Sequence, residues 1–430
     1  MRAEEPRPPV LTHSVYSLMA RGSMLLARGL GLILISRRLG GEHFGVYALL
    51  LATYSLCASV GAFGIEQTSL YLVGRRQKRL PILVGNSLLL ALFCGLPAAL
   101  LCFGTVTVLR DRFFTGATWE VAALTALGLP IGIAHNALVG LVVGLGRFRY
   151  YGFVELCKWL AYLALVGLFY VRSGLSVFTS LGSFFAVLLG ASLVHLAFFT
   201  FRLHARPTPC LRLLRRMLAM GRRMLLVQLT SVLALRLDVY AVRFFGAMGL
   251  VGTYALATHL GEILMYVARS FAMVVFSGTA RGSRPAALRL GLLVGALVMA
   301  AVCLALGVVF LREGVLVALF GETSRGCVPS LLVRMPGVLA AAIALLIAGE
   351  LLGRGRADVV VRAYALAVFC AVVLFWPLCR WDTALGAATA FSVASTAQAL
   401  WMAVVLKSAR ALQAPREASL GAMAPSLAAE

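Results

Sequence analysis

SRRLGGEHFGVYALLLATYSLCASVGAF, residues 36–63, carries the clearest sign of how this chain is built, because part of it occurs twice. Gly45-Val46-Tyr47-Ala48-Leu49 recurs as Gly252-Thr253-Tyr254-Ala255-Leu256, and the preceding Arg37-Arg38-Leu39-Gly40 matches Arg243-Phe244-Phe245-Gly246. The two copies open long apolar runs at corresponding places in the two halves of the chain. A repeat of this kind indicates duplication, so we expect two related halves.

The composition places both halves in a membrane. Of 430 residues, 61% are hydrophobic and 13% charged, and the mean hydropathy is +0.94. Soluble domains carry roughly 25% charged residues. Apolar runs of about 20 residues cross a hydrocarbon core of about 30 Å as helices, which satisfy their own backbone hydrogen bonds in lipid. We therefore predict an all-α integral membrane protein.

The apolar runs predict about twelve transmembrane helices in two pseudo-symmetric six-helix bundles around a central cleft. The first six lie near 14–36, 44–72, 82–109, 119–143, 152–171 and 176–201, and the second six near 223–244, 250–279, 287–311, 327–352, 359–378 and 383–406. Because six is an even number, both halves share one orientation in the membrane, as in repeats related by an axis along the membrane normal.

Basic residues orient the spans. The connections that would face away from the N-terminus hold Arg37, Arg38, Arg110, Arg112, Arg172, Arg243, Arg312, Arg325 and Arg380. Most of the other Lys and Arg residues fall on the side of the N-terminus. Since cytoplasmic loops carry the excess of Lys and Arg, we expect both termini in the cytoplasm and a location in the cell inner (plasma) membrane.

These patterns divide the chain into five parts. We expect a cytoplasmic N-terminus over 1–13, an N-terminal bundle over 14–201, a basic cytoplasmic linker over 202–222, a C-terminal bundle over 223–406 and a cytoplasmic tail over 407–430. The linker sequence LRLLRRMLAMGRRM is typical of an amphipathic helix on an anionic leaflet, where each basic residue contributes about 1 kcal/mol.

Several function classes are excluded by what the sequence lacks. The formal charge of +23 is not gathered into a basic domain with interleaved aromatic residues, so we expect no nucleic-acid partner. The nine Cys residues form no CxxC pair or Cys/His cluster, so no metal site or cofactor is predicted. GxxxxGK[ST], HExxH and GxSxG are all absent. We predict a transporter, not an enzyme, that lacks an ATPase motif and is coupled to protons or sodium.

Ionisable residues inside the predicted spans are the candidates for function, because each costs roughly 2.5–3.5 kcal/mol at the bilayer centre unless it faces a polar cavity. On the first helix Arg21 and Arg28 share a face with Ser14 and Ser17, and on the eighth one face holds His259, Glu262, Tyr266 and Arg269. The two helices belong to different halves, so we expect these polar faces to meet across the cleft. We predict that substrate is bound by Arg21, Arg28, Arg236, Arg269, His259 and Tyr266.

The acidic residues within the spans are candidates for coupling or gating, namely Glu262, Asp238 and Glu155. Arg236 and Asp238 are two positions apart on the seventh helix and cannot share a face well, so each should meet a different partner. Glu155 and Lys158, three apart, are expected to neutralise each other, and Arg334, Arg362, Glu66 and Glu350 to form structural ion pairs or snorkel. His135, Asn136 and His195 are expected to be satisfied interior polar groups, with proton carriage as the alternative. Basic residues still outnumber acidic ones, and a cationic cleft suits an anionic substrate.

Three stretches resemble the polysaccharide-exporter, or lipid-linked oligosaccharide, flippases of the multidrug/oligosaccharidyl-lipid/polysaccharide (MOP) superfamily. They are LG-x(3)-FG-x-YAL at Leu39 to Leu49, RLD…G…GxYA at Arg236 to Ala255, and GRFRYYGFVELCKWLAYL at Gly146 to Leu163. The resemblance implies two bundles in a V, alternating access, and movement of an undecaprenyl-(pyro)phosphate-linked oligosaccharide from the inner to the outer leaflet for surface polysaccharide assembly.

The resemblance also implies the partners. These are the lipid-linked glycan, membrane lipids and neighbouring glycan polymerases or glycosyltransferases, and we expect the chain to act as a monomer. Three alternatives remain open at this stage. A lipid II flippase would suit the same cationic cleft, a drug or cation exporter of the same superfamily would need an acidic and aromatic pocket, and a membrane-embedded glycan polymerase or ligase would need catalytic residues in a long outer loop.

Overall fold

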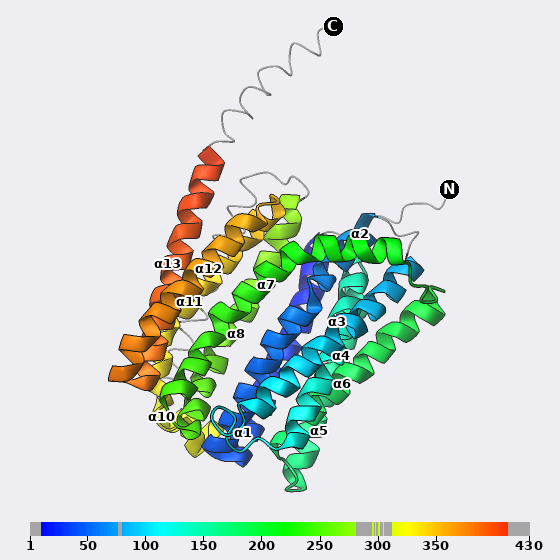
Figure 1. Ribbon diagram of the computed structural model, residues 1–430. Helices are drawn as coiled ribbons and strands as arrows, with labels where there is room; N and C mark the ends of the chain where they lie inside the picture. The colour runs from blue at the N-terminus through cyan, green and yellow to red at the C-terminus, as the bar shows by residue number, and fades with distance from the viewer. Residues whose placement is uncertain are drawn as a thin grey trace.

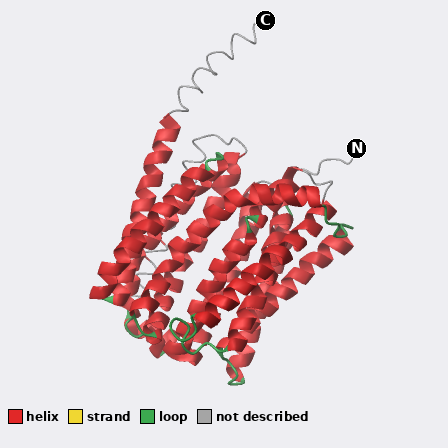
Figure 2. Ribbon diagram, in the orientation of Figure 1, coloured by secondary structure: helices red, strands yellow, loops and turns green. Residues whose placement is uncertain are grey.

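A computed structural model describes residues 10–75, 80–280 and 312–411, with a few positions between 295 and 304. The described residues form helices and connections only, with no strand among them (Figure 2). The helices are α1 (Val10–Ala62), α2 (Ile65–Arg75), α3 (Leu80–Val108), α4 (Trp119–Gly144), α5 (Phe148–Val171), α6 (Val177–Ala197), α7 (Leu211–Phe245), α8 (Met248–Ala280), α10 (Glu313–Phe320), α11 (Cys327–Gly353), α12 (Ala357–Trp381) and α13 (Thr383–Ala411). A π-helical turn, Phe198–Arg202, follows α6, and a 3₁₀ turn, Glu322–Ser324, follows α10.

The helices lie in two groups, one formed by α1–α6 and the other by α7–α13 (Figure 1). Two ends of this arrangement are named by what lies there. The linker end is where α7 begins, and the repeat end is where α7 ends at Phe245 and α8 begins at Met248. The predicted all-α fold of two helical halves is confirmed.

The long helix α1 consists of two helices that run in opposite directions. Gly40 at their junction has φ +68° and ψ 177°, a conformation that favours glycine. Gly41 packs against Gly249 at the repeat end, while Arg28 contacts Tyr266, further along α8 toward the linker end. The part before Gly40 therefore descends toward the repeat end, and the part after it returns. These parts are the first and second predicted spans.

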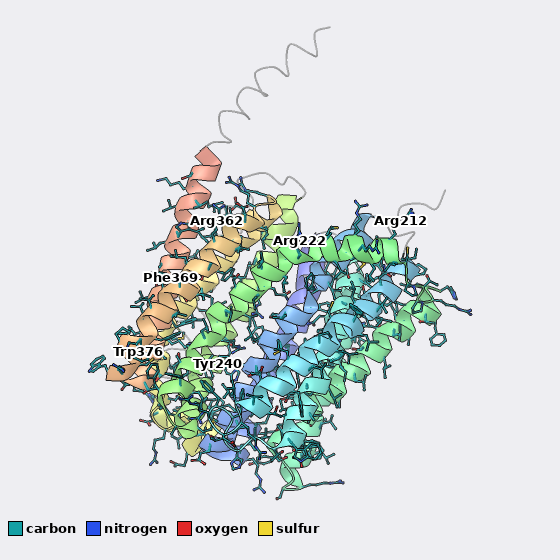
Figure 3. All side chains as sticks on the ribbon, viewed as in Figure 1. Arg212, Arg222, Tyr240, Arg362, Phe369 and Trp376 are labelled. Carbon is teal, nitrogen blue, oxygen red and sulfur yellow. The ribbon has the colours of Figure 1, made fainter. Side chains whose placement is uncertain are left out.

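In the described part of the chain, nine helices are long and apolar enough to cross a membrane. That number counts the two parts of α1 as one helix. It does not include α8, which is another long helix of the bundle. The span expected near 287–311 lies outside the described residues apart from a few positions between 295 and 304. Large apolar side chains also cover the outer surface: Phe93 is 74% exposed, Leu100 73% and Phe369 66%. Phe369 is labelled in Figure 3. Apolar surface on this scale needs lipid around it, and the chain is a multi-pass membrane protein.

Two boundaries differ from the expectation. The second span was expected to run to residue 72, but the chain breaks at Phe63 and Gly64, both with positive φ, before α2 begins. Of the basic segment expected to be a separate linker over 202–222, residues 211–222 are the start of α7, which is continuous to Phe245. Hydropathy missed the break because a bend within an apolar run leaves the composition unchanged. It missed the continuity of α7 because that depends on packing of Leu213 and Met217 against the N-terminal half.

The first turns of α7 are amphipathic, as the sequence predicts. They lie across the linker end over the N-terminal half before α7 turns along the bundle, between the labelled Arg212 and Arg222 (Figures 1 and 3). Leu213 and Met217 are buried against the N-terminal half, while Arg212 and Arg222 are exposed. The arrangement fits a helix that rests at a membrane surface.

The sequence repeat marks the place where the two halves meet. A Cβ atom at Gly45 would overlap the carbonyl oxygen of Met248, and one at Gly252 would overlap that of Gly41. Each repeat glycine thus admits the backbone of the opposite half, as small residues do where membrane helices cross closely.

The arginine that precedes each repeat also reaches across to the other half. Arg37 donates to the carbonyl of Ala318, which lies on α10 in the C-terminal half. Arg243 donates to the carbonyls of Arg112 and Phe113, both at 2.7 Å, in the connection between α3 and α4. These reciprocal contacts explain why the Arg-x-x-Gly lead-in is part of the repeat. They join the two halves at the repeat end.

Candidate functional site

Arg28 of α1 connects the two halves inside the bundle. Its guanidinium donates to the hydroxyl of Tyr266 on α8 and lies 5.4 Å from the centre of that ring. It also lies 5.7 Å from the ring centre of Trp159 on α5. Two aromatic faces attract a cation, while the guanidinium keeps further donors for a ligand. The expected meeting of the first and eighth helices is therefore confirmed at Arg28.

The second cation at this interface is Arg236 of α7, which pairs with Glu262 of α8. His259 Nδ1 lies 3.5 Å from the other oxygen of Glu262, and the His259 ring meets the ring of Phe44 edge-on at 6.5 Å. The three polar side chains are partly accessible, at 19% for Arg236, 14% for Glu262 and 12% for His259. The carboxylate is thus held between one cation and one imidazole.

Arg269 adds a third cation, one helical turn beyond Tyr266. Its side chain is exposed, and its guanidinium lies 5.5 Å from the centre of the Tyr266 ring. Within the described side chains, Glu262 is the one carboxylate paired in this cluster, and neither Arg28 nor Arg269 has a carboxylate within salt-bridge distance. Arg21 lies on α1, but its side chain is outside the described part. We call Arg28, Arg236, Glu262, Tyr266 and Arg269 the cationic cluster.

Asp238 lies in a separate network, as its spacing from Arg236 predicts. It pairs with Arg334 of α11, and the two side chains are 1% and 2% exposed. Tyr254 joins them, since its hydroxyl donates to Asp238 Oδ2 at 2.8 Å and accepts from Arg334 Nη1 at 2.8 Å. The Arg334 guanidinium also lies 3.9 Å from the ring centre of Phe391. Arg334 is thus the structural ion pair expected, and a role of Asp238 in coupling stays a prediction.

Glu155 pairs with Lys158, as expected, and both its oxygens lie 2.7 Å from the ammonium. This pair is buried inside the N-terminal half with His135 and is not part of the cationic cluster. Glu350 is also paired, with Arg354 at 2.5 Å at the end of α11.

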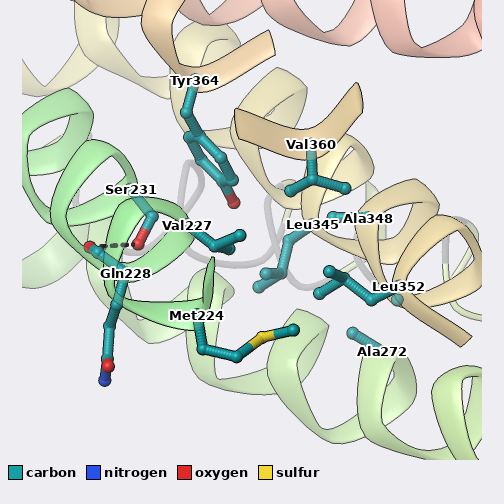
Figure 4. Close-up of a pocket in the computed structure, with 11 residues that line it drawn as sticks. Met224, Val227, Gln228, Ser231, Ala272, Leu345, Ala348, Leu352, Val360 and Tyr364 are labelled. Carbon is teal, nitrogen blue, oxygen red and sulfur yellow. Dashed lines mark hydrogen bonds between the residues drawn. The ribbon is translucent and has the colours of Figure 1, made fainter. Parts of the chain in front are cut away.

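A cavity of about 230 Å³ lies inside the C-terminal half, between α7, α8, α11 and α12 (Figure 4). Its walls are mainly apolar, with Met224, Val227, Leu345, Leu352 and Val360 among them. Ser231 donates its hydroxyl proton to the backbone carbonyl of Gln228, so that proton is not available to a ligand in the cavity. None of the predicted site residues lines this cavity.

Sequence reasoning found the charged members of the cationic cluster but missed Trp159. This tryptophan follows Lys158 directly and lies within the GRFRYYGFVELCKWLAYL segment. An aromatic residue in an apolar span usually packs in the core, and only the position of α5 beside α1 shows that its ring faces a guanidinium. Tyr254 was missed as a partner of Asp238 for the same reason, although it lies in the repeat.

Comparison with known proteins bears on the fold. No protein-family model matches the chain, and neither does any curated protein. An inward-facing multidrug-resistance MATE transporter of the MOP superfamily has a TM-score of 0.70 at 16% identity, covering 92% of this chain and 98% of that one. The outward-facing form of such a transporter gives a TM-score of 0.69 at 16% identity, covering 93% and 95%.

A MOP superfamily transporter from Pyrococcus furiosus, for which a reversed polarity of the binding pocket suggests a different function, has a TM-score of 0.64 at 14% identity. It covers 92% of this chain and 95% of that one. Similarity over nearly the whole of both chains defines the architecture. The chain has the fold of the MATE transporters of the MOP superfamily.

Proposed function

We propose that this chain is a flippase that moves an undecaprenyl-(pyro)phosphate-linked oligosaccharide from the inner to the outer leaflet by alternating access. The observation that carries the proposal is the charge of the cationic cluster. Arg28, Arg236 and Arg269 meet there with Glu262 as the paired carboxylate. A site with surplus positive charge between two halves suits an anionic cargo.

The chemistry of arginine favours a phosphate-bearing cargo. A guanidinium presents a rigid fork of donors that matches two phosphate oxygens at once. Arg28 is held by aromatic groups on both halves, so a diphosphate that binds it would change the contact between α1 and α8. Binding at this position therefore affects the relation between the two halves, which is what alternating access requires.

The membrane orientation is part of the proposal. We place the linker end and both termini in the cytoplasm and the chain in the inner membrane. The exposed Arg212 and Arg222 at the linker end support this, because basic residues gather on the cytoplasmic side. The fold is shared with both inward-facing and outward-facing transporters, which supports a cycle between such states.

A drug or cation exporter of the same fold is disfavoured by the same charges. A lipophilic cation needs a carboxylate that is free to pair with it, but Glu262 is paired with Arg236. Pocket polarity also differs within the superfamily, as the description of the Pyrococcus furiosus transporter states. A membrane-embedded polymerase is disfavoured because it would need catalytic residues in a long outer loop, and the connection between α3 and α4, residues 109–118, is short.

The proposal is tested by removing the cations singly in cells that need this chain for export. Arg28→Ala and Arg269→Ala should abolish surface glycan and accumulate its lipid-linked precursor on the inner face, and the same holds for Arg21→Ala. The reason is that each substitution removes donors or positive charge available to the diphosphate. Surface glycan and extracted lipid-linked precursor are measured together, at equal protein level.

Arg172→Ala is the matched control, because Arg172 is exposed at the repeat end, away from the cationic cluster. It should leave export unchanged. Export that persists in the Arg21, Arg28 and Arg269 variants would remove the cationic cluster from the mechanism.

A further inference from the structure

Glu262 of α8 brings a negative charge into a site that otherwise gathers cations. Its carboxylate pairs with Arg236 of α7, and His259 Nδ1 lies 3.5 Å from its second oxygen. The side chain of Glu262 is 14% exposed and that of Arg236 is 19% exposed. The pair is therefore partly open, and a ligand can reach the guanidinium while the helices around it stay folded.

The structural ion pair of the same half is closed by comparison. Asp238 and Arg334 are 1% and 2% exposed, and the hydroxyl of Tyr254 bonds to both of them. A fully buried pair of this kind cannot lose one partner without a large cost. The pair of Arg236 and Glu262 is under no such constraint, so its partners can be exchanged.

Glu262 also acts on the cations around it. Arg28 of α1 lies close enough to Glu262 for an electrostatic interaction between their charges. Tyr266, which accepts from Arg28, follows Glu262 by one helical turn, and Arg269 follows by one more on the same face of α8. An anion held by these arginines would lie near the Glu262 carboxylate. Two negative charges in one site repel each other, so they compete for the same cations.

We propose that Glu262 is an internal competitor of the cargo. It holds Arg236 while the site is empty, gives up that guanidinium when the lipid-linked diphosphate binds, and recovers it when the cargo leaves. This regulation of the cationic cluster rests on the proposed function.

The exchange changes which parts of the molecule are joined. Arg236 and Glu262 both belong to the C-terminal half, so their pair holds α7 to α8 within that half. A diphosphate bound by Arg28 and Arg236 would instead join α1 of the N-terminal half to α7 of the C-terminal half. Cargo thus replaces a contact within one half by a contact between the halves. It thereby binds one arrangement of the halves better than another, as a ligand must if it is to shift a conformational equilibrium.

The carboxylate also limits how tightly the cargo is held. Three arginines without a counter-ion would bind a diphosphate strongly and release it slowly, because differences in affinity lie mainly in the dissociation rate. Glu262 offers Arg236 another partner at the moment of release and repels the departing anion. The competitor therefore lowers affinity and speeds release.

A purely structural role for Glu262 leads to the opposite expectation. If the carboxylate only kept Arg236 in place, its removal would let the guanidinium turn away, and cargo would bind more weakly. If the carboxylate competes with cargo, its removal makes cargo bind more tightly. The sign of the change in affinity separates the two roles.

The first measurement is the binding of undecaprenyl diphosphate to the full chain in nanodiscs. Glu262→Gln should lower the Kd by at least about tenfold, the lower end of what close charge pairs contribute to binding. Glu262→Ala, a second neutral variant, should behave in the same way. Glu322→Gln is the matched control and should leave the Kd unchanged, because its carboxylate is 73% exposed at the repeat end. An unchanged or higher Kd in both Glu262 variants overturns the proposal.

The exchange of partners is tested by a double-mutant cycle with Arg236. In Arg236→Gln there is no guanidinium for Glu262 to occupy, so adding Glu262→Gln should tighten binding by clearly less than it does in the unsubstituted chain. An equal gain in both backgrounds would mean that Glu262 acts only through its general charge, and that result overturns the exchange.

Release is tested by flipping of a fluorescent undecaprenyl diphosphate-linked saccharide in liposomes. Glu262→Gln should move the probe more slowly than the unsubstituted chain although it binds undecaprenyl diphosphate more tightly. Movement at an equal or higher rate overturns the role in release.

The variants also separate this proposal from the function on which it rests. Binding that is unchanged in Arg28→Ala overturns the proposed cargo site itself. Binding that is lost in Arg28→Ala, but is unchanged or weakened in Glu262→Gln, overturns the competition by Glu262 alone.

Discussion

Replacing Arg334 with Met is expected to destabilise the chain by about 3–5 kcal/mol, because it leaves the Asp238 carboxylate buried without its cation. The two side chains are 2% and 1% exposed, so water cannot solvate the carboxylate that remains. Tyr254 would keep its single hydrogen bond to Asp238, which compensates only part of the loss. The measurement is thermal unfolding of the purified chain in detergent, which should show a large fall in Tm.

The double variant Asp238→Leu with Arg334→Met should recover much of that loss, since no unpaired charge remains and apolar groups fill the space. Arg325→Met is the matched control. It breaks the pair with Glu322, whose side chains are 69% and 73% exposed, and exposed pairs contribute about 0–1 kcal/mol. An equal Tm for Arg334→Met and Arg325→Met would show that the buried network does not stabilise the C-terminal half.

Ala or Leu at Gly45 or Gly252 is expected to separate the two halves at the repeat end. A Cβ at either position would overlap a backbone carbonyl of the opposite half, which cannot move aside as a side chain could. Overpacking of this kind costs about 1–3 kcal/mol, and here the strain is relieved by moving the halves apart. Hydrogen exchange should therefore speed up in peptides that cover 41–52 and 248–256.

Gly190→Ala is the control for this experiment, because a Cβ at Gly190 on α6 would meet no atom within 4 Å. Its exchange pattern should match that of the unsubstituted chain. Unchanged exchange in Gly252→Leu would mean that the repeat glycines do not control the contact between the halves.

The repeat could be recognised in the sequence because its glycines are required for close backbone contact and because both copies stand at the same place in their halves. Hydropathy located the spans for a related reason, since crossing a membrane requires a long apolar run whatever its neighbours are. The bend at Phe63 and Gly64 and the continuity of α7 from the basic segment were not predictable in this way. Both depend on packing of distant segments, here the start of α7 against the N-terminal half.

The candidate site shows the same division. Residue type and helical spacing identified Arg28, Arg236, Glu262 and Arg269 as candidates. A charged side chain within a span is costly, so its presence indicates a function or a partner. Their partners could not be read from spacing. Arg28 and Tyr266 are brought together only by tertiary packing.

The most direct test of the proposed function is a flipping assay with the purified chain in liposomes. The probe is a fluorescent undecaprenyl diphosphate-linked saccharide, and its arrival in the outer leaflet is followed with a membrane-impermeant quencher. The unsubstituted chain and Arg172→Ala should move the probe well above the rate of protein-free liposomes, and Arg28→Ala should fall to that background. Equal rates for the unsubstituted chain and Arg28→Ala, or no movement by the unsubstituted chain, would contradict a cationic cluster that carries a lipid-linked diphosphate.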